Sequence, residues 1–150
     1  MKNRFVGRTF ILPNQSAREN AVAMKMNPIR STIEGKRILI VDDSIVRGTT
    51  LMKLIKLLRS AGAKEVHVRI GCPPVIAPCY YGVDMKTRDQ FIACTHTVDQ
   101  IRQSIGADSL AYISIDGLVE ALEIPKEDLC LACVDGIYPT RIDGEKYRYD

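Results

Sequence analysis

The segment that most constrains the fold is a short apolar run that leads into a loop and a helix. Residues 38–41 (Ile-Leu-Ile-Val) are apolar without alternation and rich in β-branched side chains, as in a parallel strand buried on both faces. A helix is predicted to follow, because apolar residues recur at helical spacing at Leu51, Leu54, Ile55 and Leu58. Gly62 is a natural end for that helix, and alternation over residues 66–70 predicts a second strand. Strand, loop, helix and strand in this order predict a βαβ crossover.

The remaining segments extend this α/β pattern. A capping box at residues 16–19 predicts a helix over residues 17–26, and three prolines make residues 71–79 irregular. A second capping box begins at Thr97 and predicts a helix to Gly106, with Val98, Ile101 and Ile105 on its apolar face. Further elements are expected at residues 88–93 (short helix), 110–113 (strand) and 115–122 (helix). The expected fold class is therefore α/β: a mostly parallel sheet with flanking helices and a loop-rich C-terminal tail.

The residues after the first strand suggest a binding site. Asp42 and Asp43 follow the strand directly, and the next seven residues include Gly48 and three hydroxyl side chains, at Ser44, Thr49 and Thr50. Backbone amides at a helix N-terminus favour a phosphate, glycine permits close approach, and two carboxylates suit sugar hydroxyls or Mg²⁺. The simpler interpretation is that the acids end a strand and that a threonine caps the helix; the order of all these features favours the phosphate site.

Charge and composition exclude some classes of protein. The 150 residues carry a net charge of +3, and no apolar run reaches the length of a membrane span. Basic residues are in excess over the first 37 residues, which suits a polyanionic small molecule about as well as a nucleic acid. Five cysteines without a secretion signal favour a reducing, cytoplasmic compartment over a disulfide framework.

Cys130 and Cys133 form a Cys-x-x-Cys pair. From spacing alone this pair is half a zinc site, a redox pair, half of a cluster site or two unrelated thiols. Cys79 is the natural third thiolate. Cys72 and Cys94 are expected to be buried structural thiols.

Residues 41–50 (Val-Asp-Asp-Ser-Ile-Val-Arg-Gly-Thr-Thr) resemble the phosphoribosyl-pyrophosphate motif of type I phosphoribosyltransferases, in the form found in the amidophosphoribosyltransferase family. Residues 2–11, 81–85 and 101–108 also match that family's pattern. The resemblance implies a partial type I phosphoribosyltransferase fold over residues 1–124, with the catalytic loop at 1–15, and a cysteine-bearing tail at 125–150.

The resemblance also implies roles for individual residues. The expected reaction is the glutamine-dependent amination of 5-phosphoribosyl pyrophosphate to 5-phosphoribosylamine, which begins purine synthesis. Asp42 and Asp43 would bind the ribose hydroxyls and Mg²⁺, and Lys2 and Arg8 would act on the pyrophosphate. The 5′-phosphate loop would consist of Ser44, Arg47, Gly48, Thr49 and Thr50. In the iron–sulfur branch of the family, Cys79, Cys130 and Cys133 would bind a [4Fe–4S] cluster whose fourth ligand lies outside this chain.

The chain departs from the family in one respect: nothing in it matches the N-terminal glutaminase domain or the first strands of the phosphoribosyltransferase domain. We therefore expect an exposed apolar sheet edge, and no glutamine-dependent activity from the isolated chain. Its expected partners are 5-phosphoribosyl pyrophosphate, nucleoside monophosphates, the missing N-terminal portion and further copies in a homo-oligomer, with no nucleic acid and no membrane. The alternatives are a non-catalytic, nucleotide-sensing module of the same fold and a structural zinc protein.

Overall fold

The structure is a computed structural model that describes residues 28–83 and 88–142. The helix predicted at residues 17–26, the catalytic loop at 1–15 and the two basic residues Lys2 and Arg8 lie outside the described residues.

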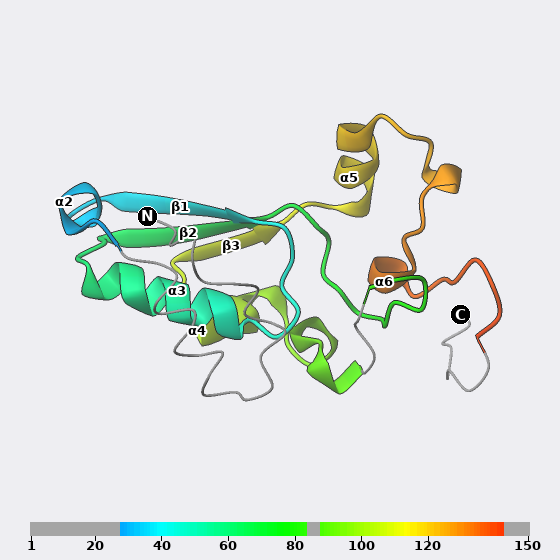
Figure 1. Ribbon diagram of the computed structural model, residues 1–150, viewed down its shortest axis with the longest axis horizontal. Coiled ribbons are helices and arrows are strands. Elements are labelled where there is room, and N and C mark those ends of the chain that lie inside the picture. Colours follow the sequence, from blue (N-terminus) through cyan, green and yellow to red (C-terminus); the bar gives the residue numbers. More distant parts are fainter. Residues whose placement is uncertain (1–27, 84–87, 143–150) are drawn as a thin grey trace.

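The centre of the fold is a three-stranded parallel sheet in the order β1-β2-β3 (Figure 1). The strands are β1 (Arg37–Asp42), β2 (Glu65–Ile70) and β3 (Ser109–Tyr112). In the register, Ile38 of β1 pairs with Val66 of β2, and Val68 of β2 pairs with Leu110 of β3. The predicted βαβ crossover and the α/β fold class are confirmed; the third strand begins and ends one residue earlier than predicted.

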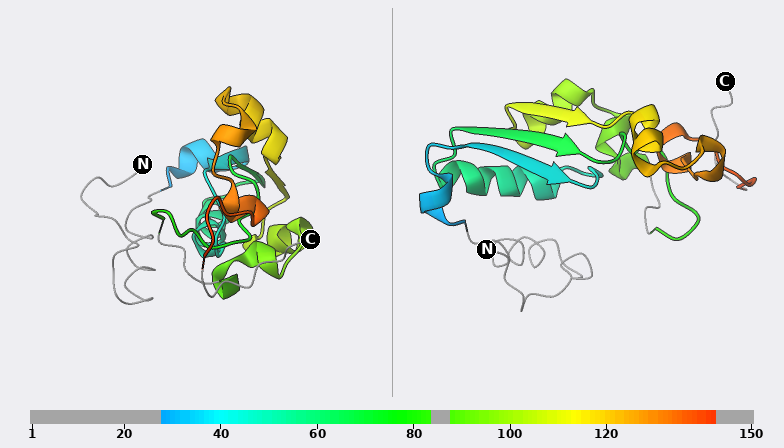
Figure 2. Two further views of the ribbon diagram at one scale, coloured as in Figure 1. Left: turned by 90° about the vertical axis from the view of Figure 1, so that its right-hand side faces the viewer. Right: turned by 90° about the horizontal axis from the view of Figure 1, so that it is seen from above.

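Two helices cover one face of this sheet, as the two views of Figure 2 show. They are α3 (Thr49–Ser60), which connects β1 to β2, and α4 (Val98–Ile105), which precedes β3. Other elements lie at the strand ends and in the tail: α2 (Arg30–Ile33), η2 (Arg88–Gln90), η3 (Ile92–Cys94), α5 (Ile115–Leu122), η4 (Lys126–Asp128) and α6 (Ala132–Asp135). No helix of the described ranges is long and apolar enough to cross a membrane.

The hydrophobic core lies between β2 and the two helices. Most of its buried members come from these three elements: Leu51, Ile55, Val66, Val68, Ile70, Ile101 and Ile105. The others, Ile45, Ala63 and Ala107, lie in the adjoining connections. The core therefore holds the N-terminal end of α3 against the sheet, at the point where the predicted phosphate loop begins.

The prediction that the first strand is buried on both faces is wrong. Leu39 is 60% exposed and Val41 is 73% exposed, because β1 is an edge strand and α3 and α4 cover only the opposite face. Parallel sheets are ordinarily covered on both faces, so this open apolar surface is unusual. Within the described residues, β1 is an outer strand of the sheet, and the apolar side chains that it exposes lie on the uncovered face.

The two 3₁₀ turns η2 and η3 replace the predicted helix over residues 88–93. They are separated by Phe91, which has an extended backbone (φ −92°, ψ 109°) and is 1% exposed. Burial of the Phe91 ring interrupts the helix at this residue, and the spacing of apolar residues in the sequence does not reveal the interruption. The short helix α2 was not predicted.

The capping box at the start of α4 is confirmed: the Gln100 amide nitrogen donates to Thr97 Oγ1, and the Thr97 amide nitrogen donates to Gln100 Oε1. Gly106 ends the helix in the left-handed region (φ 78°), also as predicted. Val98 is 42% exposed, however, so its assignment to the buried face is wrong.

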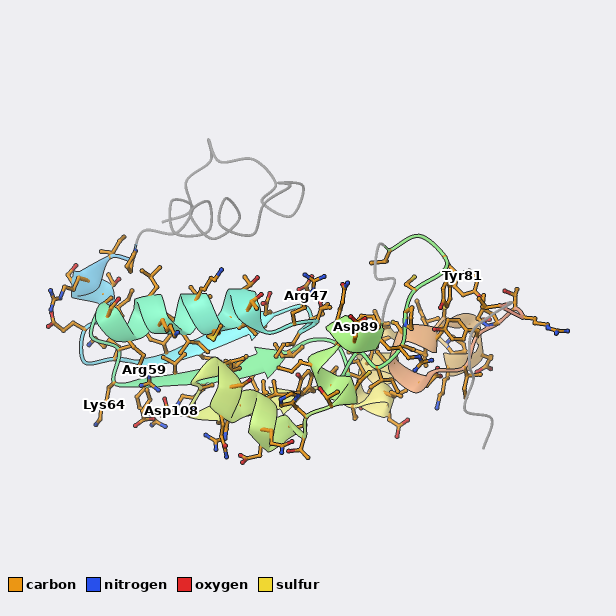
Figure 3. The ribbon with its side chains drawn as sticks, turned by 90° about the horizontal axis from the view of Figure 1, so that it is seen from below. Arg47, Arg59, Lys64, Tyr81, Asp89 and Asp108 are labelled. Carbon is orange, nitrogen blue, oxygen red and sulfur yellow. The ribbon has the colours of Figure 1, made fainter. Side chains whose placement is uncertain are left out.

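Asp108 ties the core helix α3 to the sheet. Its Oδ2 accepts hydrogen bonds from the Val66 amide nitrogen and from Arg59 Nη2, each at 2.6 Å (Figure 3). These bonds, the backbone bond above all, lower the pKa of Asp108. Their contribution is therefore fully present above the ordinary aspartate pKa and is lost as pH falls through the lowered value.

We expect Asp108→Asn to lower the free energy of unfolding at neutral pH by about 1 kcal/mol, since exposure to solvent weakens such bonds. Urea unfolding at neutral and acidic pH measures this, and the difference from the parent chain should close at acidic pH. Asp99→Asn, which removes a carboxylate bonded only within α4, serves as control and should cost less. An equal loss in both variants would contradict this account.

Candidate functional site

The candidate site is the connection between β1 and α3, at the carboxyl edge of the parallel sheet. Asp42 ends β1, and Gly48 is the N-cap of α3, so residues 43–47 form the loop between them. Open α/β sheets bind ligands outside the carboxyl ends of their strands. The fold therefore places the predicted site residues where such a sheet binds small molecules.

No side-chain hydrogen bond caps the N-terminus of α3 within the described residues. Gly48 takes the left-handed conformation (φ 75°), and its carbonyl accepts the first helical bond from Met52 at 2.9 Å. Thr49 and Thr50 lie inside the helix, so the interpretation in which one of them is the N-cap is wrong. The first amides of the helix are left for an anion, and the helix dipole favours one there.

The two carboxylates bond to the loop backbone instead of capping the helix. Asp42 Oδ1 accepts from the Asp43 amide at 3.1 Å, and Asp43 Oδ1 accepts from the Ser44 amide at 2.8 Å. Burial raises the pKa of Asp42, and the neighbouring charge of Asp43 raises it further, against the lowering effect of the Asp43 amide. A divalent cation would relieve this repulsion, so the pair suits Mg²⁺ or the hydroxyls of a sugar.

Gly48 has little free space around it. A Cβ at this position would lie 3.2 Å from Ile105 Cγ2 and 3.6 Å from Ile92 Cδ1. The glycine therefore satisfies both a backbone conformation and a close contact with α4 and η3.

The structure brings the predicted phosphate-loop residues into one segment: Asp42, Asp43, Ser44, Arg47, Gly48, Thr49 and Thr50. Arg47 is exposed and donates through Nη2 to Gln90 Oε1. Gln90 was not predicted as part of the site. Because it lies 43 residues further along the chain, no local pattern identifies it.

The cysteine-bearing segments also lie together. The amides of Ile76 and Ala77 donate to the Cys133 carbonyl at 2.9 and 3.1 Å, and Tyr138 Oη donates to the Pro78 carbonyl at 2.7 Å. The irregular segment that carries Cys79 is thus fastened to α6 and the residues after it.

The thiols are close enough to affect one another electrostatically. Burial raises the pKa of Cys133, and the charges of Cys79 and Cys130 raise it further. Among residues 28–83 and 88–142, no group of three or more Cys, His, Asp or Glu side chains is arranged to hold a metal ion. The fold therefore gathers the three predicted cluster ligands into one region without assembling a metal site.

The two remaining thiols differ from each other. Cys72 is half-buried; burial raises its pKa, and the charges of Cys133 and Asp43 add to this effect. Cys94 is exposed, so the prediction that it is a buried thiol is wrong. Its Sγ donates to the Ile76 carbonyl at 3.1 Å.

Comparison with known proteins agrees with this geometry. A family model described as "Phosphoribosyl transferase domain" matches residues 4–74. The amidophosphoribosyltransferase of Methanothermobacter thermautotrophicus is 57% identical over 150 residues, which is 100% of this chain and 32% of that protein. The Bacillus subtilis enzyme of the same name is 51% identical over 146 residues, or 95% of this chain and 31% of that protein.

A solved structure gives the same result. The glutamine phosphoribosylpyrophosphate amidotransferase from B. subtilis, complexed with ADP and GMP, superposes with a TM-score of 0.81 at 50% identity, covering 97% of this chain and 33% of that one. By sequence and by fold, the chain is similar over almost its whole length to amidophosphoribosyltransferases, and it spans about a third of the length of the relatives it matches.

Proposed function

We propose that this chain supplies the phosphoribosyl-binding part of an amidophosphoribosyltransferase. The whole enzyme would aminate 5-phosphoribosyl pyrophosphate with ammonia from glutamine, releasing pyrophosphate and forming 5-phosphoribosylamine. The observation that carries the proposal is the loop of residues 42–50, which combines two carboxylates with an uncapped helix N-terminus at a sheet edge. Identities of 51–57% to enzymes of this name support an enzyme rather than a non-catalytic nucleotide sensor or a zinc protein.

In the proposed mechanism the chain positions the sugar and stabilises charge. Asp42 and Asp43 bind the ribose hydroxyls, while the amides and hydroxyls of residues 44–50 bind the 5′-phosphate. Ammonia attacks the anomeric carbon as the bond to pyrophosphate breaks, so positive charge develops on the sugar and negative charge on the leaving group. Mg²⁺, when bound, neutralises the departing pyrophosphate. Lys2 and Arg8, in the proposed catalytic loop at residues 1–15, add positive charge there.

Glutamine hydrolysis is assigned to a region outside this chain, in keeping with relatives about three times as long. The open face of the sheet supports such a partner, because Leu39 and Val41 would be covered by it. We propose that residues 1–124 belong to the phosphoribosyltransferase domain and that residues 125–150 form a C-terminal tail. Nucleoside monophosphates would bind through the same phosphate loop, and the assembled enzyme would be a homo-oligomer.

The experiment that tests the proposed function is isothermal titration of the full chain with 5-phosphoribosyl pyrophosphate, with and without Mg²⁺. We expect saturable binding that Mg²⁺ strengthens. Binding of GMP but not of the sugar pyrophosphate would favour the nucleotide-sensing module. No binding of either compound would contradict the proposal.

We also propose that Cys79, Cys130 and Cys133 bind a [4Fe–4S] cluster, with the fourth ligand from outside the chain. Three cysteines carried by two fastened segments support this, since iron–sulfur clusters are held by cysteine side chains that lose their protons on binding. Anaerobic reconstitution with iron and sulfide should give a brown protein that contains acid-labile sulfide.

Two variants test this cysteine assignment. Cys133→Ser should lose the colour, whereas the control Cys94→Ser, at an exposed thiol outside the proposed set, should keep it. A colourless chain that takes up stoichiometric zinc would show a structural zinc site instead.

A further inference from the structure

Three consecutive residues of the phosphate loop, Val46, Arg47 and Gly48, are contacted by two residues of the η2–η3 segment, Gln90 and Ile92. Arg47 donates to Gln90 Oε1, and the Ile92 amide donates to the Val46 carbonyl at 2.9 Å. Ile92 Cδ1 also lies 3.6 Å from the position of a Cβ at Gly48. The segment therefore contacts three parts of the phosphate loop: the backbone at Val46, the side chain of Arg47 and the glycine at position 48.

The contacting segment is itself held in place. The Phe91 side chain between Gln90 and Ile92 is 1% exposed, which anchors this segment in the protein interior. At its end, Cys94 Sγ donates to the Ile76 carbonyl, and Ile76 in turn donates to Cys133. The position of Gln90 is thus set by the burial of Phe91 and by the hydrogen bonds that Ile92 and Cys94 make beyond it.

Arg47 needs such support because it is an exposed, long side chain at the N-terminal end of α3, where Figure 3 shows it on the same side of the molecule as Asp89 of η2. A free arginine loses rotamer entropy when it binds a phosphate, and a neutral acceptor that orients the guanidinium beforehand reduces this loss. Gln90 accepts one N–H and, being neutral, adds no negative charge of its own beside the guanidinium. A carboxylate in its place would pair with Arg47 and compete with the phosphate.

We propose that Gln90 is a positioning residue that orients Arg47 toward the 5′-phosphate of the ligand. The inference rests on the proposed function, because it assumes that residues 42–50 bind a phosphorylated sugar. Gln90 lies 43 positions from Arg47 in the chain and on a different element. It would act on the ligand through the Arg47 guanidinium and not by direct contact.

The test is a double-variant cycle with ribose 5-phosphate as the probe, measured by isothermal titration of the full chain. Gln90→Leu keeps a similar side-chain volume but removes the acceptor, and we expect it to weaken binding by about 3- to 10-fold. Arg47→Met should weaken binding at least as much. Adding Gln90→Leu to Arg47→Met should cause no further loss, because Gln90 would have no guanidinium left to orient.

Two further measurements separate positioning from a structural role. Gln103→Leu, at an exposed glutamine of α4 away from the loop, is the matched control and should leave binding unchanged. The NMR signals of the Arg47 guanidinium should be sharp in the parent chain and broaden in Gln90→Leu, while the unfolding midpoint stays constant.

Unchanged or tighter binding by Gln90→Leu, or additive losses in the double variant, would overturn the positioning role while leaving the proposed function intact. Absence of ribose 5-phosphate binding by the parent chain would overturn both.

Discussion

Replacing both loop aspartates, as Asp42→Asn with Asp43→Asn, is expected to weaken Mg²⁺-assisted binding of 5-phosphoribosyl pyrophosphate by about 100-fold or more. Each carboxylate lost from a hydrogen bond to a sugar hydroxyl or cation costs about 1.5–3 kcal/mol, and about 1.4 kcal/mol corresponds to a tenfold change. Isothermal titration at neutral pH measures the change. Burial and the charge of Asp43 raise the pKa of Asp42. As the pH is lowered, binding by the parent chain should therefore begin to weaken at a higher pH than it would if Asp42 had the ordinary aspartate pKa.

A matched control separates this effect from a change in net charge. Glu127→Gln with Asp128→Asn also removes two adjacent carboxylates, in the exposed turn η4, and should leave binding unchanged. Equal affinity in the loop variant and this control would show that Asp42 and Asp43 do not touch the ligand.

Gly48→Ala is expected to lower both stability and ligand affinity. A side chain at φ 75° costs about 1–2 kcal/mol, and the new Cβ would stand 3.2 Å from Ile105 Cγ2. Relief of that contact would shift the loop away from α4 and disturb the amides that bind the phosphate. We expect a fall of about 1–3 kcal/mol in the free energy of unfolding and at least a tenfold loss of ribose 5-phosphate binding.

Gly136→Ala provides the comparison for this prediction. Gly136 has nearly the same backbone conformation (φ 78°), but no atom lies within 4 Å of its added Cβ. It should show the backbone cost alone, with phosphate binding unchanged. Equal effects of the two alanines on binding would mean that the close packing of Gly48 has no role in the site.

The elements that could be predicted from the sequence are those set by local patterns. The βαβ crossover follows from alternation and helical spacing, and the α4 boundaries follow from Thr97, Gln100 and Gly106. The burial of β1 could not be predicted in the same way. An apolar run indicates a strand, but which of its faces is covered depends on elements far away in the chain, and here α3 and α4 cover only one.

In the candidate site too, the residues that are close in sequence could be predicted, and those brought together by packing could not. The loop of residues 42–50 is contiguous, so its carboxylates, hydroxyls and glycine could be identified together before the structure was known. Gln90 could not, because its contact with Arg47 depends on the packing of Phe91 and on the two 3₁₀ turns that replace the expected helix. The three cysteines could be predicted only in part. The Cys-x-x-Cys spacing is a local pattern, whereas the approach of Cys79 depends on hydrogen bonds from Ile76 and Ala77 to the tail.

The most direct test of the site is a crystal structure of the chain bound to ribose 5-phosphate and Mg²⁺. We expect phosphate oxygens about 2.7–3.2 Å from the backbone amides at the start of α3, with the sugar hydroxyls against Asp42 and Asp43. A well-ordered loop with no ligand in it, or a ligand bound elsewhere on the molecule, would contradict the assignment of residues 42–50 as the phosphoribosyl site.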